Sequence, residues 1–316
     1  MVGVAALALY AVLPGLIEVL QAWPRLAEIA PGWFAVMLMA ELASFGCVWL
    51  LQRFVFVGAP WFALVTSQLA SNAFSRVVPG GAAAGGALQY RMLTVAGVDT
   101  ARSAAGLTAI SLITTASVLM LPLLSLPAVV DPQVVVPGGL EAAAWIGAGI
   151  FAAMFGLGLL LATTTTPLLQ LGHLIDRARR RLGRPTDGDL GQRLLEERSV
   201  VLGSLGRRWP WAVMTAVGKW LFDFYALLAA LAATGDETRT SLVLLAYVAG
   251  AVLAMIPITP GGLGFVEAGL TATLVAAGVT PGRAVLATLA YRLVSYWIPM
   301  VAGLGAWVGF RSTHPE

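Results

Sequence analysis

Two stretches of this sequence place helix-breaking residues inside strongly apolar surroundings. The breaking residues are prolines and glycines, namely Pro79, Gly80, Gly81, Pro260, Gly261, Gly262 and Gly264. Because proline lacks a backbone N–H and glycine lacks helix stiffness, we expect a helix to end and another to begin in each stretch. A half-helix that begins there would aim free N–H groups at its surroundings, which suits a phosphate ligand.

The polar side chains near these breaks, and in the later apolar helices, are of types that bind anions or carry protons. They are Asn72, Arg76, Arg91, Lys219, Asp223, Glu267, Tyr291 and Arg292. Arginine can hold a phosphate through two parallel hydrogen bonds. An uncompensated charge at mid-membrane costs roughly 2.5–3.5 kcal/mol on insertion scales, so we expect these groups to line a cavity or to form pairs.

Each charged side chain also has a purely structural interpretation. Arg76 and Arg91 could be interfacial residues that reach toward the membrane surface. Glu267 could stabilise the first turn of its own helix. Lys219 and Asp223 lie four residues apart on one helical face and could simply neutralise each other. With one cysteine and two histidines in the chain, we predict a substrate-binding site without a catalytic group, metal or cofactor.

The two breaks belong to an apparent internal duplication. Residues 79–102 align without gaps on residues 260–283 and are identical at nine of 24 positions, at a constant offset of 181. The identities include both Pro-Gly-Gly triplets, both Ala-Gly-Val triplets and the arginines Arg102 and Arg283. We therefore predict two repeats, covering residues 34–123 and 213–304.

The composition indicates the class of protein. Hydrophobic residues make up 59% of the 316 residues, charged residues only 11%, and the mean hydropathy is +0.85. Soluble domains carry about 25% charged residues, so this composition is typical of an integral membrane protein. We predict an all-α polytopic membrane protein forming a single membrane domain over residues 1–316, with about six full transmembrane helices and two re-entrant broken-helix hairpins.

The expected full spans lie at residues 2–20, 34–55, 102–123, 142–161, 211–231 and 283–307, and the two hairpins at 61–97 and 242–278. Residues 173–209 contain nine of the 19 basic residues, which predicts a cytoplasmic loop with an amphipathic helix on the membrane surface. Both termini are then cytoplasmic. The loop lacks interleaved aromatic residues, so we expect no nucleic-acid partner. Three spans separate the hairpins, which predicts opposite entry sides and an inverted repeat.

Residues 72–81, 96–98 and 257–269 together resemble a flippase-like family of integral membrane proteins. Its best-known member is the membrane region of lysylphosphatidylglycerol synthase, and the Pro-Gly-Gly-Leu-Gly-x-x-Glu element at residues 260–267 is the most specific signature. The resemblance covers nearly the whole chain. It implies translocation of an amphipathic lipid between the leaflets of the cell membrane, and the arginines and half-helix ends near the breaks favour an anionic or phosphate-bearing one. The first hairpin has Gly86 where the second has Glu267, so we expect the two halves to differ in function.

The aminoacyl-transferase domain of the full synthase is absent from this sequence. We therefore expect lipid synthesis to belong to a separate lipid-modifying enzyme, and this chain not to be an enzyme. The alternative is a secondary transporter of a soluble metabolite or ion, with Glu267 or Asp223 carrying a proton. A lipid site must open laterally between helices, whereas a soluble substrate needs no lateral opening.

Overall fold

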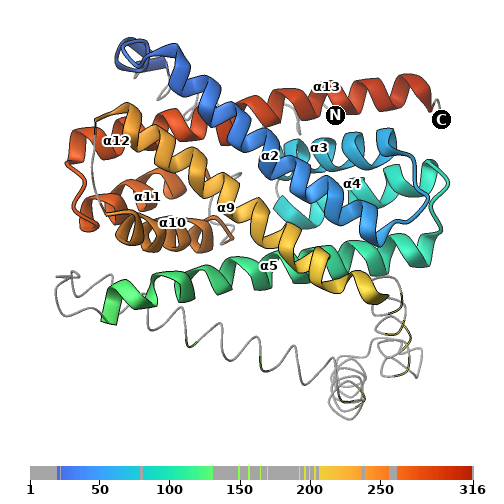
Figure 1. Ribbon diagram of the computed structural model, residues 1–316. Coiled ribbons are helices and arrows are strands. Elements are labelled where there is room, and N and C mark those ends of the chain that lie inside the picture. The colour runs from blue at the N-terminus through green and yellow to red at the C-terminus, as the bar shows by residue number, and fades with distance from the viewer. Residues whose placement is uncertain are drawn as a thin grey trace, which may run out of the picture.

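The computed structural model describes residues 20, 21, 23–78, 81–130, 206–235, 239–255 and 262–314, with a few isolated positions between 149 and 203. Its principal elements are all helical (Figure 1): α2 (Pro31–Val55), α3 (Trp61–Val77), α4 (Gly81–Val95), α5 (Thr100–Val130), η1 (Gly206–Arg208), α9 (Trp209–Ala233), α10 (Thr240–Met255), α11 (Phe265–Ala276), α12 (Pro281–Arg292), η3 (Leu293–Trp297) and α13 (Ile298–Thr313). The expected spans at 2–20 and 142–161, and most of the basic loop at 173–209, lie outside the described residues.

Three described stretches are long and apolar enough to cross a membrane: Pro31–Val55, Trp209–Ala233 and Pro281–Thr313. They match three of the predicted spans, so the all-helical membrane fold is confirmed. Pro31 and Pro281 each occupy the start of a helix, where the missing N–H costs no hydrogen bond. The third stretch is not a uniform α-helix, because the π-helical turn η3 separates α12 from α13.

Both predicted helix breaks are present. Helix α3 ends at Val77 and α4 begins at Gly81, while α10 ends at Met255 and α11 begins at Phe265. The helices of each pair pack against one another. A Cβ atom added at Gly85 of α4 would lie 2.6 Å from the Ser71 carbonyl oxygen of α3, so only glycine allows this approach. Whether each pair re-enters the membrane from one face stays a prediction.

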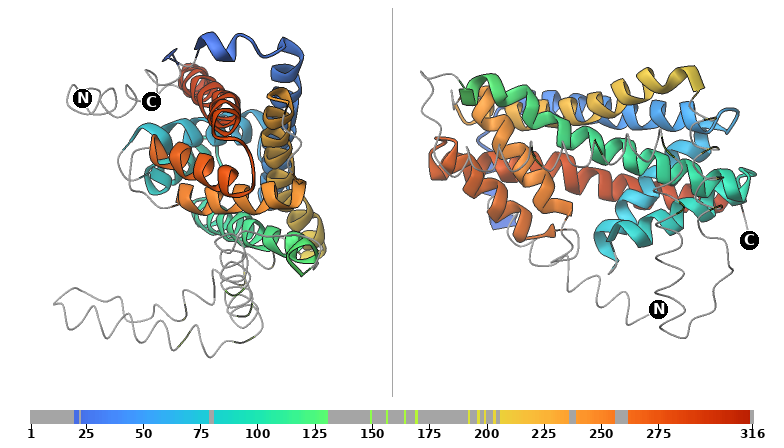
Figure 2. Two further views of the ribbon diagram at one scale, coloured as in Figure 1. Left: turned by 90° about the vertical axis from the view of Figure 1, so that its left-hand side faces the viewer. Right: turned by 90° about the horizontal axis from the view of Figure 1, so that it is seen from below.

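The two predicted repeats share one order of elements: long helix, short helix, short helix, long helix. Their first helices, α2 and α9, lie side by side and run in opposite directions, and the pairs α3–α4 and α10–α11 occupy opposite ends of the bundle (Figure 1). The first short helix of each predicted repeat packs on the last long helix of the other repeat. Helix α3 packs on α13, and its counterpart α10 packs on α5. Viewed along the long helices, α5 and α13 lie on opposite sides of α10 and α11 (Figure 2).

The distribution of side chains is inverted relative to a soluble bundle. Met39 and Val301 are large apolar residues that are 66% and 65% exposed on the outer faces of α2 and α13. Charged residues such as Glu41, Asp223 and Glu267 are buried inside the helix bundle. An exposed apolar surface of this extent suits hydrocarbon rather than water. The fold therefore presents an apolar exterior to the membrane and collects its charges in the interior.

Candidate functional site

A polar cavity of about 150 Å³ lies between α2, α3, α9 and the α12–η3 segment, and we call it the central cavity. Its polar lining residues are Glu41, Ser44, Gln68, Asn72, Arg76, Lys219, Asp223, Tyr291, Arg292 and Ser295. Six of the fifteen predicted site residues are among them, although they come from both repeats. The cavity is therefore built where the two halves of the molecule meet.

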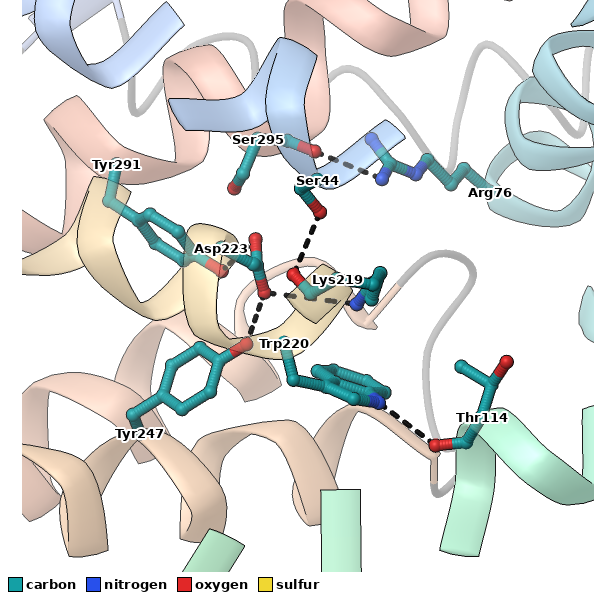
Figure 3. A network of polar contacts seen from close by, with 9 residues as sticks. All are labelled: Ser44, Arg76, Thr114, Lys219, Trp220, Asp223, Tyr247, Tyr291 and Ser295. Carbon is teal, nitrogen blue, oxygen red and sulfur yellow. Dashed lines mark hydrogen bonds and ion pairs between the residues drawn. The ribbon is translucent and has the colours of Figure 1, made fainter. Parts of the chain in front are cut away.

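Asp223 of α9 is the centre of a hydrogen-bond cluster on one side of this cavity (Figure 3). Its Oδ1 atom accepts a hydrogen bond of 3.0 Å from the Tyr291 hydroxyl, and its Oδ2 atom accepts one from the Tyr247 hydroxyl. The Lys219 Nζ atom lies 3.9 Å from Oδ2, so the predicted pairing of Lys219 with Asp223 is present. Lys219 also lies over the ring of Trp220, with Nζ 3.1 Å from the ring centroid. This environment compensates both charges.

Contacts from neighbouring helices fix the position of α9 in this cluster (Figure 3). The Ser44 hydroxyl of α2 donates to the Lys219 carbonyl at 3.0 Å, and the Trp220 indole N–H donates to the Thr114 carbonyl of α5 at 2.9 Å. Hydrogen bonds of this kind between membrane helices each contribute about 0.6 kcal/mol on average. They hold Lys219 and Asp223 toward the cavity.

Glu41 is a cavity residue that the sequence analysis did not select. It belongs to α2, is only 4% exposed, and its carboxyl group interacts with that of Asp223. Its Oε1 atom has no hydrogen-bond partner among the described residues. The available signal was a glutamate inside an apolar span, since ionisable residues at membrane depth are expensive and usually functional.

Arg76 of α3 points into the bundle, so its interpretation as a side chain that reaches the membrane surface is wrong. It donates to the Ser295 carbonyl at 3.0 Å and to the Tyr296 carbonyl in η3. Pro299 lacks the N–H that would bond the Ser295 carbonyl four residues earlier in an α-helix, so the Ser295 carbonyl can accept from another helix. Arg76 thus replaces a missing helical hydrogen bond while its guanidinium lines the cavity.

Glu267 and Arg292 form a buried ion pair with 2.7 Å between Glu267 Oε1 and Arg292 Nε. Arg292 also lies over the Tyr296 ring at 4.3 Å, and Arg76 lies over the same ring at 4.5 Å. Cation–π contacts of this kind offset part of the cost of placing two guanidinium groups close together. Arg292 faces the central cavity, whereas Glu267 lines a different one.

The other predicted site residues that the structure describes do not line the central cavity. Arg91 lies with Arg311 and His314 at a separate cavity between α4 and α13. Gly81, Gly262 and Gly264 are described and all adopt positive φ angles, as expected where a helix starts after a sharp turn. The other four, Pro79, Gly80, Pro260 and Gly261, lie outside the described residues.

The central cavity can bind a ligand that carries both a negative charge and hydrogen-bond donors. Arg76, Lys219 and Arg292 supply cationic donors, and one oxygen each of Glu41 and Asn72, which has no hydrogen-bond partner among the described residues, can accept hydrogen bonds. No group of three or more His, Cys, Asp or Glu side chains is placed to hold a metal ion within the described part of the chain. The arrangement suits reversible binding of a phosphate-bearing polar group that also carries hydrogen-bond donors.

Comparison with known proteins agrees with this architecture. A family profile described as the lysylphosphatidylglycerol synthase TM region matches residues 2–303. The chain belongs to this family. Over 97 residues it is 28% identical to a UPF0104 membrane protein of Methanothermobacter thermautotrophicus, a match covering 31% of this chain and 29% of the relative. Over 61 residues it is 43% identical to a UPF0104 membrane protein of Pyrococcus horikoshii, covering 19% of this chain and 18% of the relative.

The matched regions therefore span less than a third of the length of these two relatives. No solved structure matches the chain. Membership of the family makes the protein a multi-pass membrane protein of the lysylphosphatidylglycerol synthase TM region type.

Proposed function

We propose that the protein moves the polar headgroup of a phosphate-bearing lipid between membrane leaflets through the central cavity. The observation that carries this proposal is a charged cavity enclosed by helices whose outer faces are apolar. A lipid in transit needs both environments at once, because its headgroup must avoid hydrocarbon while its tails remain in it. The cations Arg76, Lys219 and Arg292 would compensate the phosphate charge.

The arrangement of the two repeats supports the same proposal. Helices α2 and α9 are antiparallel counterparts, and the broken pairs α3–α4 and α10–α11 approach the middle of the bundle from opposite ends (Figure 1). The predicted inverted repeat would give the cavity access to either leaflet by related movements of the two broken pairs, one at each end of the bundle. The family membership of the chain is consistent with a lipid-related role.

The test is a reconstitution of the purified protein into vesicles containing fluorescent phosphatidylglycerol. An impermeant reductant bleaches the fluorophore only in the outer leaflet, so protein-dependent bleaching beyond the outer-leaflet share measures lipid movement. We expect such bleaching with wild-type protein. If no phospholipid moves while a soluble metabolite or ion shows saturable uptake, the protein is a secondary transporter of that solute instead.

A matched pair of variants ties the movement to the central cavity. Asn72 and Gln52 are both amides with a buried oxygen that has no hydrogen-bond partner among the described residues, but only Asn72 lines the cavity. Replacing either side chain by leucine therefore breaks no hydrogen bond of these two oxygens within the described part of the chain. A lost hydrogen bond to a charged group is worth about 1.5–3 kcal/mol, so Asn72→Leu should slow lipid movement roughly tenfold or more. Gln52→Leu should retain it.

A further inference from the structure

A second cavity, of about 280 Å³, lies between α11 and α12, and we call it the lateral cavity. Its polar residues are Glu267, Thr271 and Thr288. The Thr271 and Thr288 hydroxyls are 3.2 Å apart and form a direct hydrogen bond between the two helices. The side chains that hold the two helices together are therefore also the polar wall of this cavity.

Glu267 lines the lateral cavity and has a carboxylate oxygen that can accept a hydrogen bond from a ligand. The residue is only 7% exposed, and its Oε1 atom is held by Arg292. Its Oε2 atom is buried and has no hydrogen-bond partner among the described residues. A buried carboxylate oxygen without a donor is costly, so a ligand that supplies a hydroxyl or ammonium group would be stabilised there.

The outer rim of the lateral cavity is apolar. Ala268, Ala272 and Val285 are exposed, and Val285 is 42% exposed. In a membrane protein these side chains face hydrocarbon, so the cavity opens toward lipid tails rather than toward water. A polar wall behind an apolar rim fits an amphipathic ligand whose headgroup enters the protein sideways.

The ion pair of Glu267 and Arg292 is the wall between the two cavities. Arg292 lines the central cavity, Glu267 lines the lateral cavity, and 2.7 Å separates their bonded atoms. A phosphate that reaches Arg292 would compete with the Glu267 carboxylate for the same guanidinium. Breaking a buried ion pair costs about 3–5 kcal/mol when one charge is left uncompensated, so the exchange requires the phosphate to replace the carboxylate at Arg292 while a headgroup donor replaces Arg292 at Glu267.

We propose that the lateral cavity is a second headgroup site, at which Glu267 binds a hydroxyl or ammonium group of a phospholipid, and that the Glu267–Arg292 pair opens to connect it with the central cavity. This inference rests on the proposed lipid movement. It adds the route by which the headgroup enters from the bilayer, and a preference for headgroups that carry hydrogen-bond donors.

A reversible disulfide tests the route. In a Cys47→Ala background, the double variant Thr271→Cys and Thr288→Cys should form a disulfide that holds α11 against α12. Oxidation should slow phosphatidylglycerol movement about tenfold or more, and a reductant should restore it, which excludes misfolding as the cause.

The control disulfide joins α2 to α9 away from the lateral cavity. The native Cys47 Sγ atom lies 3.1 Å from the position of a Cβ atom at Gly218, so Gly218→Cys should pair with it. We expect this oxidised variant to keep moving lipid. Equal loss in both disulfide variants, or full movement in the oxidised α11–α12 variant, would overturn the lateral route while leaving the proposed function standing. Failure of the wild-type protein to move any lipid would instead overturn the proposed function.

A comparison of lipids with identical tails tests the ligand assignment. Phosphatidylglycerol carries headgroup hydroxyls, whereas phosphatidylcholine carries no hydrogen-bond donor on its headgroup. Wild-type protein should move the first roughly tenfold faster or more, by the effect of one hydrogen bond to a charged group. Glu267→Gln should reduce this ratio toward one. Equal rates for both lipids in wild-type protein would show that Glu267 does not select lipids by the hydrogen-bond donors of their headgroups.

Discussion

Arg102 and Arg283 occupy equivalent positions in the two predicted repeats, and both donate to carbonyls near the end of a long helix. Arg102 at the start of α5 donates to the carbonyls of Val55 and Val57 at the end of α2, at 3.2 and 3.1 Å. Arg283 at the start of α12 donates to the Gly235 carbonyl beyond the end of α9, at 2.9 Å. Each arginine thus donates to carbonyls that have no donor at the end of a helix. These bonds connect α5 to α2 and α12 to α9.

The first prediction is that these two contacts lie on opposite sides of the membrane. Ala101 and Gly282 are equivalent exposed neighbours of the two arginines, so cysteines there should leave both arginine contacts intact. In a Cys47→Ala background, impermeant thiol reagents should label Ala101→Cys only from the cytoplasmic side and Gly282→Cys only from the other side. Labelling of both thiols from the same side would contradict the inverted repeat.

The second prediction concerns the packing of α13 on α3. A Cβ atom at Gly303 would lie 2.2 Å from the Leu69 carbonyl oxygen, so Gly303→Ala must push the helices apart. Overpacking of this kind typically costs about 1–3 kcal/mol, and we expect a lower melting temperature in detergent. Gly305 has nothing within 4 Å of the same position, so Gly305→Ala is the matched control and should not lower stability. Equal melting temperatures for the two variants would mean that this close approach does not exist.

The third prediction is that Lys219 and Asp223 are energetically coupled. Lys219→Met leaves a buried carboxylate without its cation, and Asp223→Asn leaves a cation without its carboxylate. Each change should destabilise the protein by about 1–3 kcal/mol, less than in a fully buried pair, because the Lys219 side chain is 22% exposed. In a double-mutant cycle, the combined variant should lose less stability than the sum of the single losses. Additive losses would show that the two charges act independently.

The sequence by itself determined the membrane class and the two helix breaks, and it predicts the duplication. These features depend on composition and on local residue type, because proline and glycine end helices whatever surrounds them. The sequence also predicted Asp223 and Arg292 as interior charges, since the cost of burying a charge in hydrocarbon applies at any position in a span, but it left Arg76 open between an interior and an interfacial position.

Only the tertiary structure decided which of these residues share a cavity. In a soluble helix the apolar face marks the core, but a membrane helix is apolar toward lipid and toward its neighbours alike, so its pattern does not reveal which way a side chain points. Glu41 therefore joins Asp223 across α2 and α9, Arg91 lies elsewhere, and Glu267 faces a second cavity. The partners of Arg76 likewise required the structure, because Ser295 and Tyr296 lie more than 200 residues away along the chain.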